Sequence, residues 1–359
     1  MKAQRTYSFE PDYAVPPGET LREVMESLGM NQTELAVRTG LTVQTLIRVF
    51  NGDQPITYET ANRLELVTGV PARMWNNLEA LYREQLTRLA EREHLKADLE
   101  WLKTIPTREL IERGLVQAET DKIALLRGVL AFYGVSSVAA WRGIWENPAV
   151  AARRSPCFET RPGPASAWIR QGELQAQAIT CAPYDRELFQ QAMPRIRSLT
   201  KETPEVFAPE LRRLCAEAGV AVALVREMKK VPWNGATKWL SPHKAMILLS
   251  LRGKGEDRFW FSFFHKAGHV LNDNKRLLLV NDGDDSDGRE AKANRFAADT
   301  LIPPQFNDRV RACKTASDIV RLAGVLGVAP GIVAGRYQYL TEKWGVFKES
   351  IRPLQWVRG

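Results

Sequence analysis

Paired cysteines and long apolar runs are both missing from this sequence of 359 residues. The four cysteines are far apart and form no CxxC pair, which argues against a disulfide framework and against a thiolate zinc site. They are Cys157, Cys181, Cys215 and Cys313, and reduced thiols in a protein core are the expected reading. The N-terminal segment lacks the apolar stretch of a secretory signal, and no apolar run approaches the roughly 18 residues of a membrane span. We therefore expect a cytoplasmic protein without a membrane partner.

The overall composition is that of a globular protein with an excess of positive charge. Hydrophobic residues make up 44% of the chain and charged residues 26%, which is enough apolar material for extensive cores. A length of 359 residues suits two or three domains. The net charge of +8 suits a polyanionic partner, because neutralising phosphate groups releases counterions.

The hydrophobic pattern divides the chain into three regions. Residues 1–95 have the pattern of short helices joined by tight turns, and residues 96–203 that of a helical connecting region without a chemical motif. Over residues 204–359, helices alternate with strand-like runs rich in Val, Leu and Ile. We therefore expect a multidomain, mainly α fold, with an all-α N-terminal bundle and an α+β C-terminal domain that contains a small sheet.

Residues 31–52 have the pattern of a helix-turn-helix. Asn31 can cap a first helix, and Glu34 follows three residues later, where a capping-box partner is expected. Gly40 suits a tight turn with positive φ, and Thr42 can cap a second helix. The spacing therefore predicts two short helices that cross closely.

The same spacing separates core residues from outward residues. Leu35, Leu46 and Val49 face the shared core, whereas the outward side chains of the second helix are of types that read base edges in a DNA major groove. Gln32 and Asn51 suit contacts with phosphate groups. The predicted DNA-binding residues are Gln32, Thr33, Thr42, Val43, Gln44, Thr45, Arg48 and Asn51. The alternative is a three-helix interaction domain that does not bind DNA.

Over about residues 16–90 the sequence resembles the Xre-type helix-turn-helix of HigA-like antitoxins. The landmarks of that family are the segments PGETL, NGDQPIT, ETA and GVPARMW, which occur here in that order. The resemblance implies a repressor that controls its own promoter and binds a palindromic, double-stranded DNA operator as a homodimer. It also implies a toxin or another protein as a partner.

A second motif is the pair of histidines in HKAGH. His265 and His269 are four residues apart, so on a helix both imidazoles can reach one metal ion. Zinc needs a third protein ligand, and hydrolysis needs a base. Two histidines on a helix are also common as packing or surface residues, so this spacing alone is a weak indication.

The surroundings of this motif resemble the ImmA/IrrE metallopeptidase family over about residues 204–340. The segment FWFSFFHKAGHVL is followed by EAKANRFAADTLIPP, and in that family a Glu on a second helix supplies the third zinc ligand. The residues that match the family pattern are Glu290, Ala293, Asn294, Phe296 and Ala297. The resemblance implies a zincin-like fold with Zn as cofactor, and His265, His269 and Glu290 as its ligands.

Lys266 departs from that family, because it stands where the family has its catalytic Glu. A carboxyl group with a pKa near 4.3 is a base at pH 7, whereas a lysine with a pKa near 10.4 is not. General-base assistance contributes about 10²–10⁴-fold in rate, so we expect negligible peptidase activity by the usual mechanism and assign no catalytic residue. The ammonium group can weaken zinc binding or pair with Glu290 in place of zinc, so the sequence leaves zinc occupancy open.

Three functions follow from these patterns. The favoured one is a sequence-specific DNA-binding transcriptional regulator, an autoregulating antitoxin-like repressor whose degenerate metallopeptidase-like domain acts in sensing or partner binding. The second is an active zinc metallopeptidase that cleaves a regulatory protein and is targeted by its helix-turn-helix. The third is an interaction module that does not bind DNA. The role of residues 101–200 stays open.

Overall fold

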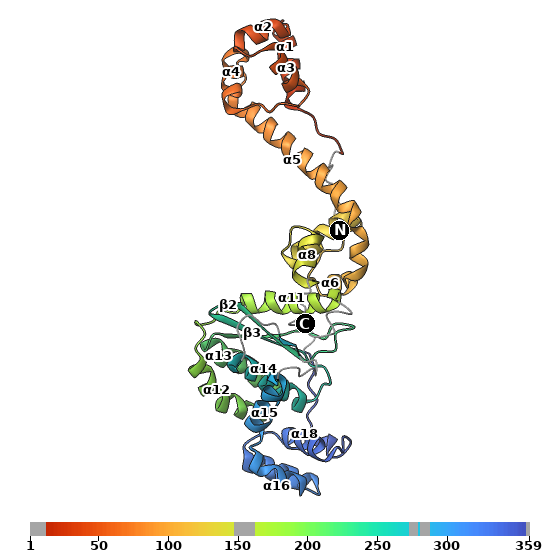
Figure 1. The fold of residues 1–359 in the computed structure, drawn as a ribbon, viewed down its shortest axis with the longest axis vertical. Coiled ribbons are helices and arrows are strands. Elements are labelled where there is room, and N and C mark those ends of the chain that lie inside the picture. Colours follow the sequence, from red (N-terminus) through yellow and green to blue (C-terminus); the bar gives the residue numbers. More distant parts are fainter. Residues whose placement is uncertain (1–11, 147–161, 273–278, 281–287, 357–359) are drawn as a thin grey trace, which may run out of the picture. The chain divides into compact units, whose positions relative to one another are not determined.

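The chain forms two compact units, Met1–Leu99 and Glu100–Gly359. The computed structural model describes residues 12–146, 162–272, 279–280 and 288–356. Cys157 lies outside these described residues. The described part is mainly helical and has a small sheet in the second unit, as the sequence predicts (Figure 1).

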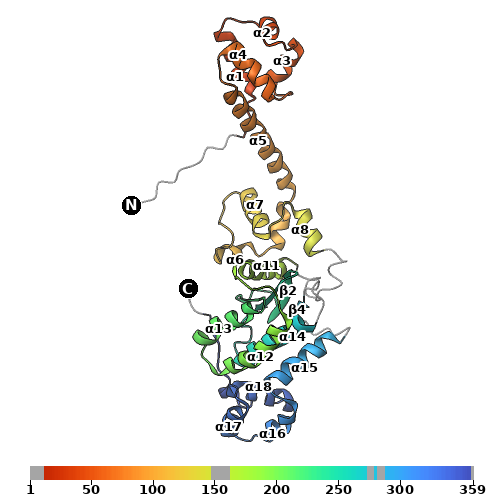
Figure 2. The same ribbon diagram turned by 90° about the vertical axis from the view of Figure 1, so that its left-hand side faces the viewer.

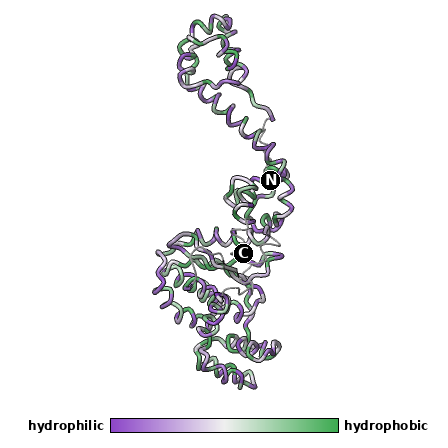
Figure 3. Tube along the Cα trace, in the orientation of Figure 1, coloured by the Kyte–Doolittle hydropathy of each residue, from purple (hydrophilic) through white to green (hydrophobic). Residues whose placement is uncertain are grey.

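The first unit is a bundle of short helices followed by a longer one. Its helices are α1 (Pro17–Ser27), α2 (Gln32–Thr39), α3 (Val43–Phe50), α4 (Tyr58–Thr68) and α5 (Ala72–Ala97). Hydrophobic and hydrophilic residues alternate along these helices, which gives each one a core-facing side (Figure 3). Fully buried side chains in this core include Leu21, Leu35, Leu46 and Trp75. Helix α1 approaches α3 closely because Gly18 has no side chain; a Cβ there would lie 2.3 Å from the Cα of Phe50.

The second unit begins with short helices that pack around aromatic side chains. These are η1 (Leu99–Thr104), α6 (Thr107–Glu112), α7 (Lys122–Tyr133), α8 (Val138–Trp145) and α11 (Pro162–Ala178). Trp101 lies edge-on to Trp141 with 5.1 Å between the ring centroids, and Tyr133 lies edge-on to the same ring at 5.9 Å. Such arrangements are preferred by aromatic pairs and stabilise a core beyond their buried area.

One stretch of this region is more apolar than the sequence reading indicates. Lys122–Trp145, which spans α7 and α8, is long and apolar enough by length and composition to cross a membrane, with a mean hydropathy of 1.7. The expectation that no run approaches that length is therefore wrong. The stretch is interrupted at Gly134, which has φ 68°, and 39% of its apolar window is buried inside the protein. Ala316–Leu326 and Pro330–Thr341 pass the same test only when taken together, and they are bent by 113°.

The sheet of the second unit has four strands in the order β1-β3-β2-β4. The strands are β1 (Val220–Leu224), β2 (Gly235–Ser241), β3 (Lys244–Leu249) and β4 (Leu279–Val280). β1 and β3 are parallel, whereas β2 is antiparallel to both β3 and β4. The first three strands coincide with the strand-like runs of the sequence.

Helices cover both faces of this sheet, which explains why its strands are almost continuously apolar. Helix α11 packs on one face, where Gly172 lies so close to Leu248 that an added Cβ would be 2.7 Å from Leu248 Cδ2. The other face is covered by α13 and α14, whose apolar side chains share a core with Val222 and Ile247 (Figure 2). The boundary expected at residue 203, between the connecting region and the C-terminal domain, stays a prediction.

The remaining helices complete the second unit. They are α12 (Arg186–Ser198), η2 (Leu199–Lys201), α13 (Pro204–Glu217), α14 (Glu256–Asn272), α15 (Arg289–Leu301), η3 (Pro304–Phe306), α16 (Asn307–Arg311), α17 (Ala316–Leu326), α18 (Pro330–Thr341) and η4 (Lys348–Ser350). Helices α14 and α15 pack tightly because Gly268 faces α15. A Cβ at Gly268 would lie 3.1 Å from Phe296 Cδ1 and 3.4 Å from Ala293 Cα.

Candidate nucleic-acid interface and candidate metal centre

Side chains cap the N-termini of α2 and α3 as the sequence predicts. Asn31 Oδ1 accepts a hydrogen bond from the backbone N–H of Glu34 at 2.9 Å, and Thr42 Oγ1 accepts one from Thr45 at 3.0 Å. Gly40 ends α2 with φ 67°, a left-handed conformation that glycine adopts without strain. The carboxylate of Glu34 binds Arg38 at 2.6 Å and not the backbone of Asn31, so the expected capping box is not formed.

The outward face of α3 is mostly exposed. Gln44, Arg48 and Asn51 are exposed, whereas Leu46 and Val49 are buried. Thr45 is half-buried, and its hydroxyl lies 2.9 Å from that of Thr42. The two threonines therefore stabilise the start of α3 as well as lying at its surface. Gln32 and Thr33 are exposed in the first turn of α2.

One exposed residue of this face is absent from the sequence prediction. Ile47 is 43% exposed, and it follows the exposed Val43 by four residues. Since residues four apart share one side of a helix, the two form a short apolar strip beside Gln44 and Arg48. The spacing from Val43 was the signal that could have identified Ile47.

The loop after α3 is fastened to α5. Glu79 is buried and accepts a hydrogen bond from the backbone N–H of Ile56 at 3.0 Å. Arg83 donates to the carboxylate of Glu79 at 2.7 Å and to the carbonyl of Gly52 at 3.1 Å. These bonds hold the C-terminal end of α3 in place. The bonds to Ile56 and Gly52 join residues more than twenty positions apart, so helical spacing did not reveal them.

The close crossing of α2 and α3, the left-handed glycine between them and the exposed second helix together define one motif. Residues 21–75 match the helix-turn-helix family model. This helix-turn-helix supports a DNA-binding transcription regulator, in agreement with the coarser part of the prediction. The match does not extend to residues 204–340, where the resemblance to metallopeptidases stays a prediction. A comparison with curated proteins finds no match to the chain.

The positive charge of the chain is not located in the helix-turn-helix unit. Residues 1–99 contain eleven Lys and Arg against fourteen Asp and Glu, a net charge of −3. Residues 100–359 contain 39 Lys and Arg against 28 Asp and Glu, a net charge of +11. The overall charge of +8 is therefore not an argument for DNA binding by the first unit.

The structure brings His265, His269 and Glu290 together between α14 and α15. The Nε2 atoms of the two histidines are 2.9 Å apart, and each lies 3.0 Å from a different oxygen of the Glu290 carboxylate. One ligand atom from each of the three residues lies within 4.8 Å of the others. Both histidines are buried, so all three donors converge in a place that is largely shielded from water. Two imidazoles and a carboxylate form a donor set typical of zinc, so the residues present fit that ion.

Asn294 orients the first of these histidines. His265 Nδ1 lies 2.8 Å from Asn294 Oδ1, one turn along α15 from Glu290. A carbonyl oxygen can only accept, so Nδ1 carries the proton and Nε2 presents its lone pair toward His269 and Glu290. Metal-binding histidines commonly have such a partner. Asn294 matches the metallopeptidase pattern in the sequence, but the sequence alone does not indicate its role.

The charges of this cluster favour an ionised carboxylate and a neutral imidazole. Burial lowers the pKa of His265, and the neighbouring charge of Lys266 lowers it further. Burial alone would raise the pKa of Glu290. A hydrogen bond from His269 and the charge of Lys266 outweigh burial and hold that pKa well below its usual range.

Lys266 is fully buried and lies against the sheet. A Cβ placed on Gly235 of β2 would lie 3.3 Å from Lys266 Cγ, so the lysine stem passes along this strand. Gly235 therefore provides space for the lysine, which is longer than the Glu found at this position in the metallopeptidases that the sequence resembles. The ligand roles of His265, His269 and Glu290 stay predictions.

Proposed function

We propose that this protein is a sequence-specific transcriptional regulator that reads a DNA operator with α3. The observation that carries the proposal is the exposed face of α3, where Gln44 and Arg48 project from a helix held by a capped turn and by the bonds from Glu79 and Arg83. Such a helix fits the major groove of B-DNA, and its first residues are those that reach base edges.

Each outward residue has a distinct chemical role in this proposal. The Gln44 amide can donate to and accept from adenine, and the Arg48 guanidinium can donate two hydrogen bonds to guanine. Gln32 and Asn51 lie at the start of α2 and just after α3, where they suit phosphate groups of the backbone. Because the unit has a net charge of −3, we infer that these directional contacts dominate over general attraction to phosphate.

We further propose that the protein acts as a homodimer on a palindromic operator near its own gene, as an antitoxin-like repressor with a protein partner. Two copies of α3 would then lie one helical turn of DNA apart, about 34–36 Å. Operator selection from random duplexes tests this arrangement. Two half-sites with that spacing are expected, and a single asymmetric site would contradict the dimer.

A matched pair of variants tests the proposal that α3 contacts the DNA bases. Arg48→Ala should weaken binding to the selected operator and relax the base preference at one position, at a cost of about 1–3 kcal/mol. Arg88→Ala removes an exposed arginine from α5, where it binds Glu84, and serves as the control. Fluorescence anisotropy measures both. Unchanged affinity and base preference for Arg48→Ala would contradict the assignment of α3.

For the second unit we propose a degenerate metallopeptidase-like domain that binds zinc without efficient hydrolysis. A zinc ion held by His265, His269 and Glu290 would supply Lewis acidity. These residues would hold the ion, and Asn294 would fix the tautomer of His265. The alternative, an active peptidase, is supported by the convergence of the three donors and opposed by Lys266. Metal analysis of the purified full chain tests the site: a folded protein without stoichiometric zinc would remove it.

A further inference from the structure

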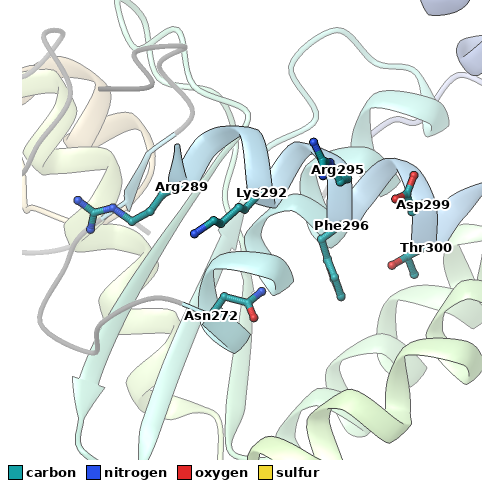
Figure 4. A pocket seen from close by; sticks show the side chains of 7 residues that line it. All are labelled: Asn272, Arg289, Lys292, Arg295, Phe296, Asp299 and Thr300. Atoms are coloured by element: carbon teal, nitrogen blue, oxygen red, sulfur yellow. The ribbon is translucent and has the colours of Figure 1, made fainter. Parts of the chain in front are cut away.

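A pocket on α15 combines three cationic side chains with one aromatic ring. It has a volume of about 940 Å³ and is open to solvent. Its lining residues are Asn272, Arg289, Lys292, Arg295, Phe296, Asp299 and Thr300 (Figure 4). The volume lies at the upper end of the range of about 300–1,000 Å³ that is typical of small-molecule sites.

The cations form a row along one helix. Arg289, Lys292 and Arg295 follow each other at three-residue spacing, so the row extends over about 9 Å at 1.5 Å per residue. Lys292 and Arg295 are exposed. A row of this length suits a chain of linked phosphate groups better than one isolated anion.

The other lining residues of the pocket have a different chemistry. Phe296, Asp299 and Thr300 come from the next turns of α15, and Asn272 comes from the end of α14 (Figure 4). An aromatic ring offers a face for stacking, and the carboxylate, hydroxyl and amide groups suit the hydroxyls and polar edges of a ligand. A uniformly acidic peptide would place carboxylates against Asp299, which disfavours that occupant.

The pocket is distinct from the candidate metal centre. At 100° per residue, Lys292, Phe296 and Asp299 lie on a different face of α15 from Glu290 and Asn294. The two faces are connected through packing, because Phe296 also contacts Gly268, the residue before His269. The cationic residues of the pocket are therefore not part of the candidate metal centre.

We propose that this pocket binds a nucleoside di- or triphosphate. The phosphate groups pair with Arg289, Lys292 and Arg295, the base stacks on Phe296, and the sugar hydroxyls bond to Asp299. The site does not depend on DNA binding by α3 or on zinc. It makes the second unit a receptor for a small anionic ligand.

Calorimetric titration of the full chain with ATP tests the proposal. EDTA is kept in the buffer so that no ligand acts through a divalent ion. We expect saturable binding with a Kd between about 10 μM and 1 mM. The double variant Lys292→Gln/Arg295→Gln should bind ATP at least about tenfold more weakly. The double variant Lys314→Gln/Arg321→Gln removes the same charge from the region of α17, outside the pocket, and should bind like the parent.

Two further probes separate the ligand classes. Phe296→Leu should weaken binding of ATP but not of inorganic triphosphate, because only ATP has a base to stack. Thermal melting of each variant shows whether it is folded. No saturable binding of ATP by the parent, an unchanged Kd in the Lys292→Gln/Arg295→Gln variant, or binding of hexaglutamate in preference to ATP would each overturn the proposal.

Discussion

The side-chain carbonyl of Asn294 accepts the Nδ1 proton of His265 across 2.8 Å, and this one bond sets which nitrogen of the imidazole faces the carboxylate of Glu290. If zinc binds here as proposed, this bond orients His265 before the ion arrives. Its neutral form is further favoured because burial lowers its pKa.

Removing this acceptor should weaken metal binding. For Asn294→Ala we expect zinc affinity to fall by about 10–100-fold, as is typical when the partner of a metal-binding histidine is lost. Asn294→Asp keeps an oxygen acceptor and should retain most of the affinity. Competition with a chromophoric chelator measures both values. Equal zinc affinity in Asn294→Ala and the parent would show that the bond does not orient a ligand.

Lys266 should limit both zinc binding and catalysis. Lys266→Met keeps a long apolar stem and removes the charge, so we expect tighter zinc binding than in the parent, because the ion no longer faces a neighbouring cation. Lys266→Glu introduces the base of the metallopeptidases that the sequence resembles and should allow slow, chelator-sensitive peptide cleavage. Cleavage of casein followed by mass spectrometry is the assay. Chelator-sensitive cleavage by the parent itself would favour the active peptidase instead.

Stability of the metal-free protein should fall in acid. The pKa of Glu290 is depressed by folding, so its contribution to stability is complete above its usual pKa, near 4.3, and is lost as pH falls toward the lower folded value. The pKa of His265 is also depressed, so its contribution is complete above about pH 6.5 and is lost on acidification. Both groups act in the same direction.

The corresponding measurement is urea unfolding from pH 7 to about pH 2 in EDTA. Glu290→Gln cannot ionise and should show a weaker decline below pH 5 than the parent does. Glu100→Gln, a change at an exposed carboxylate that binds Lys103, is the control. Parallel pH curves for the parent and Glu290→Gln would contradict this role of Glu290.

Ile47 should contribute to base preference although it has no polar atoms in its side chain. Apolar side chains in the major groove contact the methyl group of thymine, so Ile47→Ala should reduce discrimination between thymine and uracil at one operator position. Competition between duplexes that contain thymine or uracil at each position measures this difference. Val37→Ala, at an exposed position of α2, is the control. Discrimination that is unchanged in Ile47→Ala would exclude a thymine contact.

The helix-turn-helix could be predicted from sequence because its determinants are local. Asn31, Gly40 and Thr42 act within three or four residues of their partners, so spacing alone revealed their roles. Strands β1 and β3 were found for a similar reason, since they are buried on both faces and are almost continuously apolar.

Features that depend on distant partners were missed. The bonds of Glu79 and Arg83 to the loop after α3, and of Asn294 to His265, join residues more than twenty positions apart. The space that Gly235 provides for Lys266 depends on how a strand and a helix pack, which no spacing rule contains. The distribution of charge was available from sequence, but only when counted separately for each unit.

Helix α15 carries residues of both the candidate metal centre and the proposed nucleotide pocket, so the two sites can be coupled through it. Lys292 and Glu290 are two residues apart on α15, so a ligand that shifts the helix backbone at Lys292 would also shift Glu290. Coupling between two equilibria is reciprocal. If nucleotide changes the affinity for zinc by some factor, zinc must change the affinity for nucleotide by the same factor. A titration of either ligand, repeated with the other present, would therefore measure one shared coupling free energy.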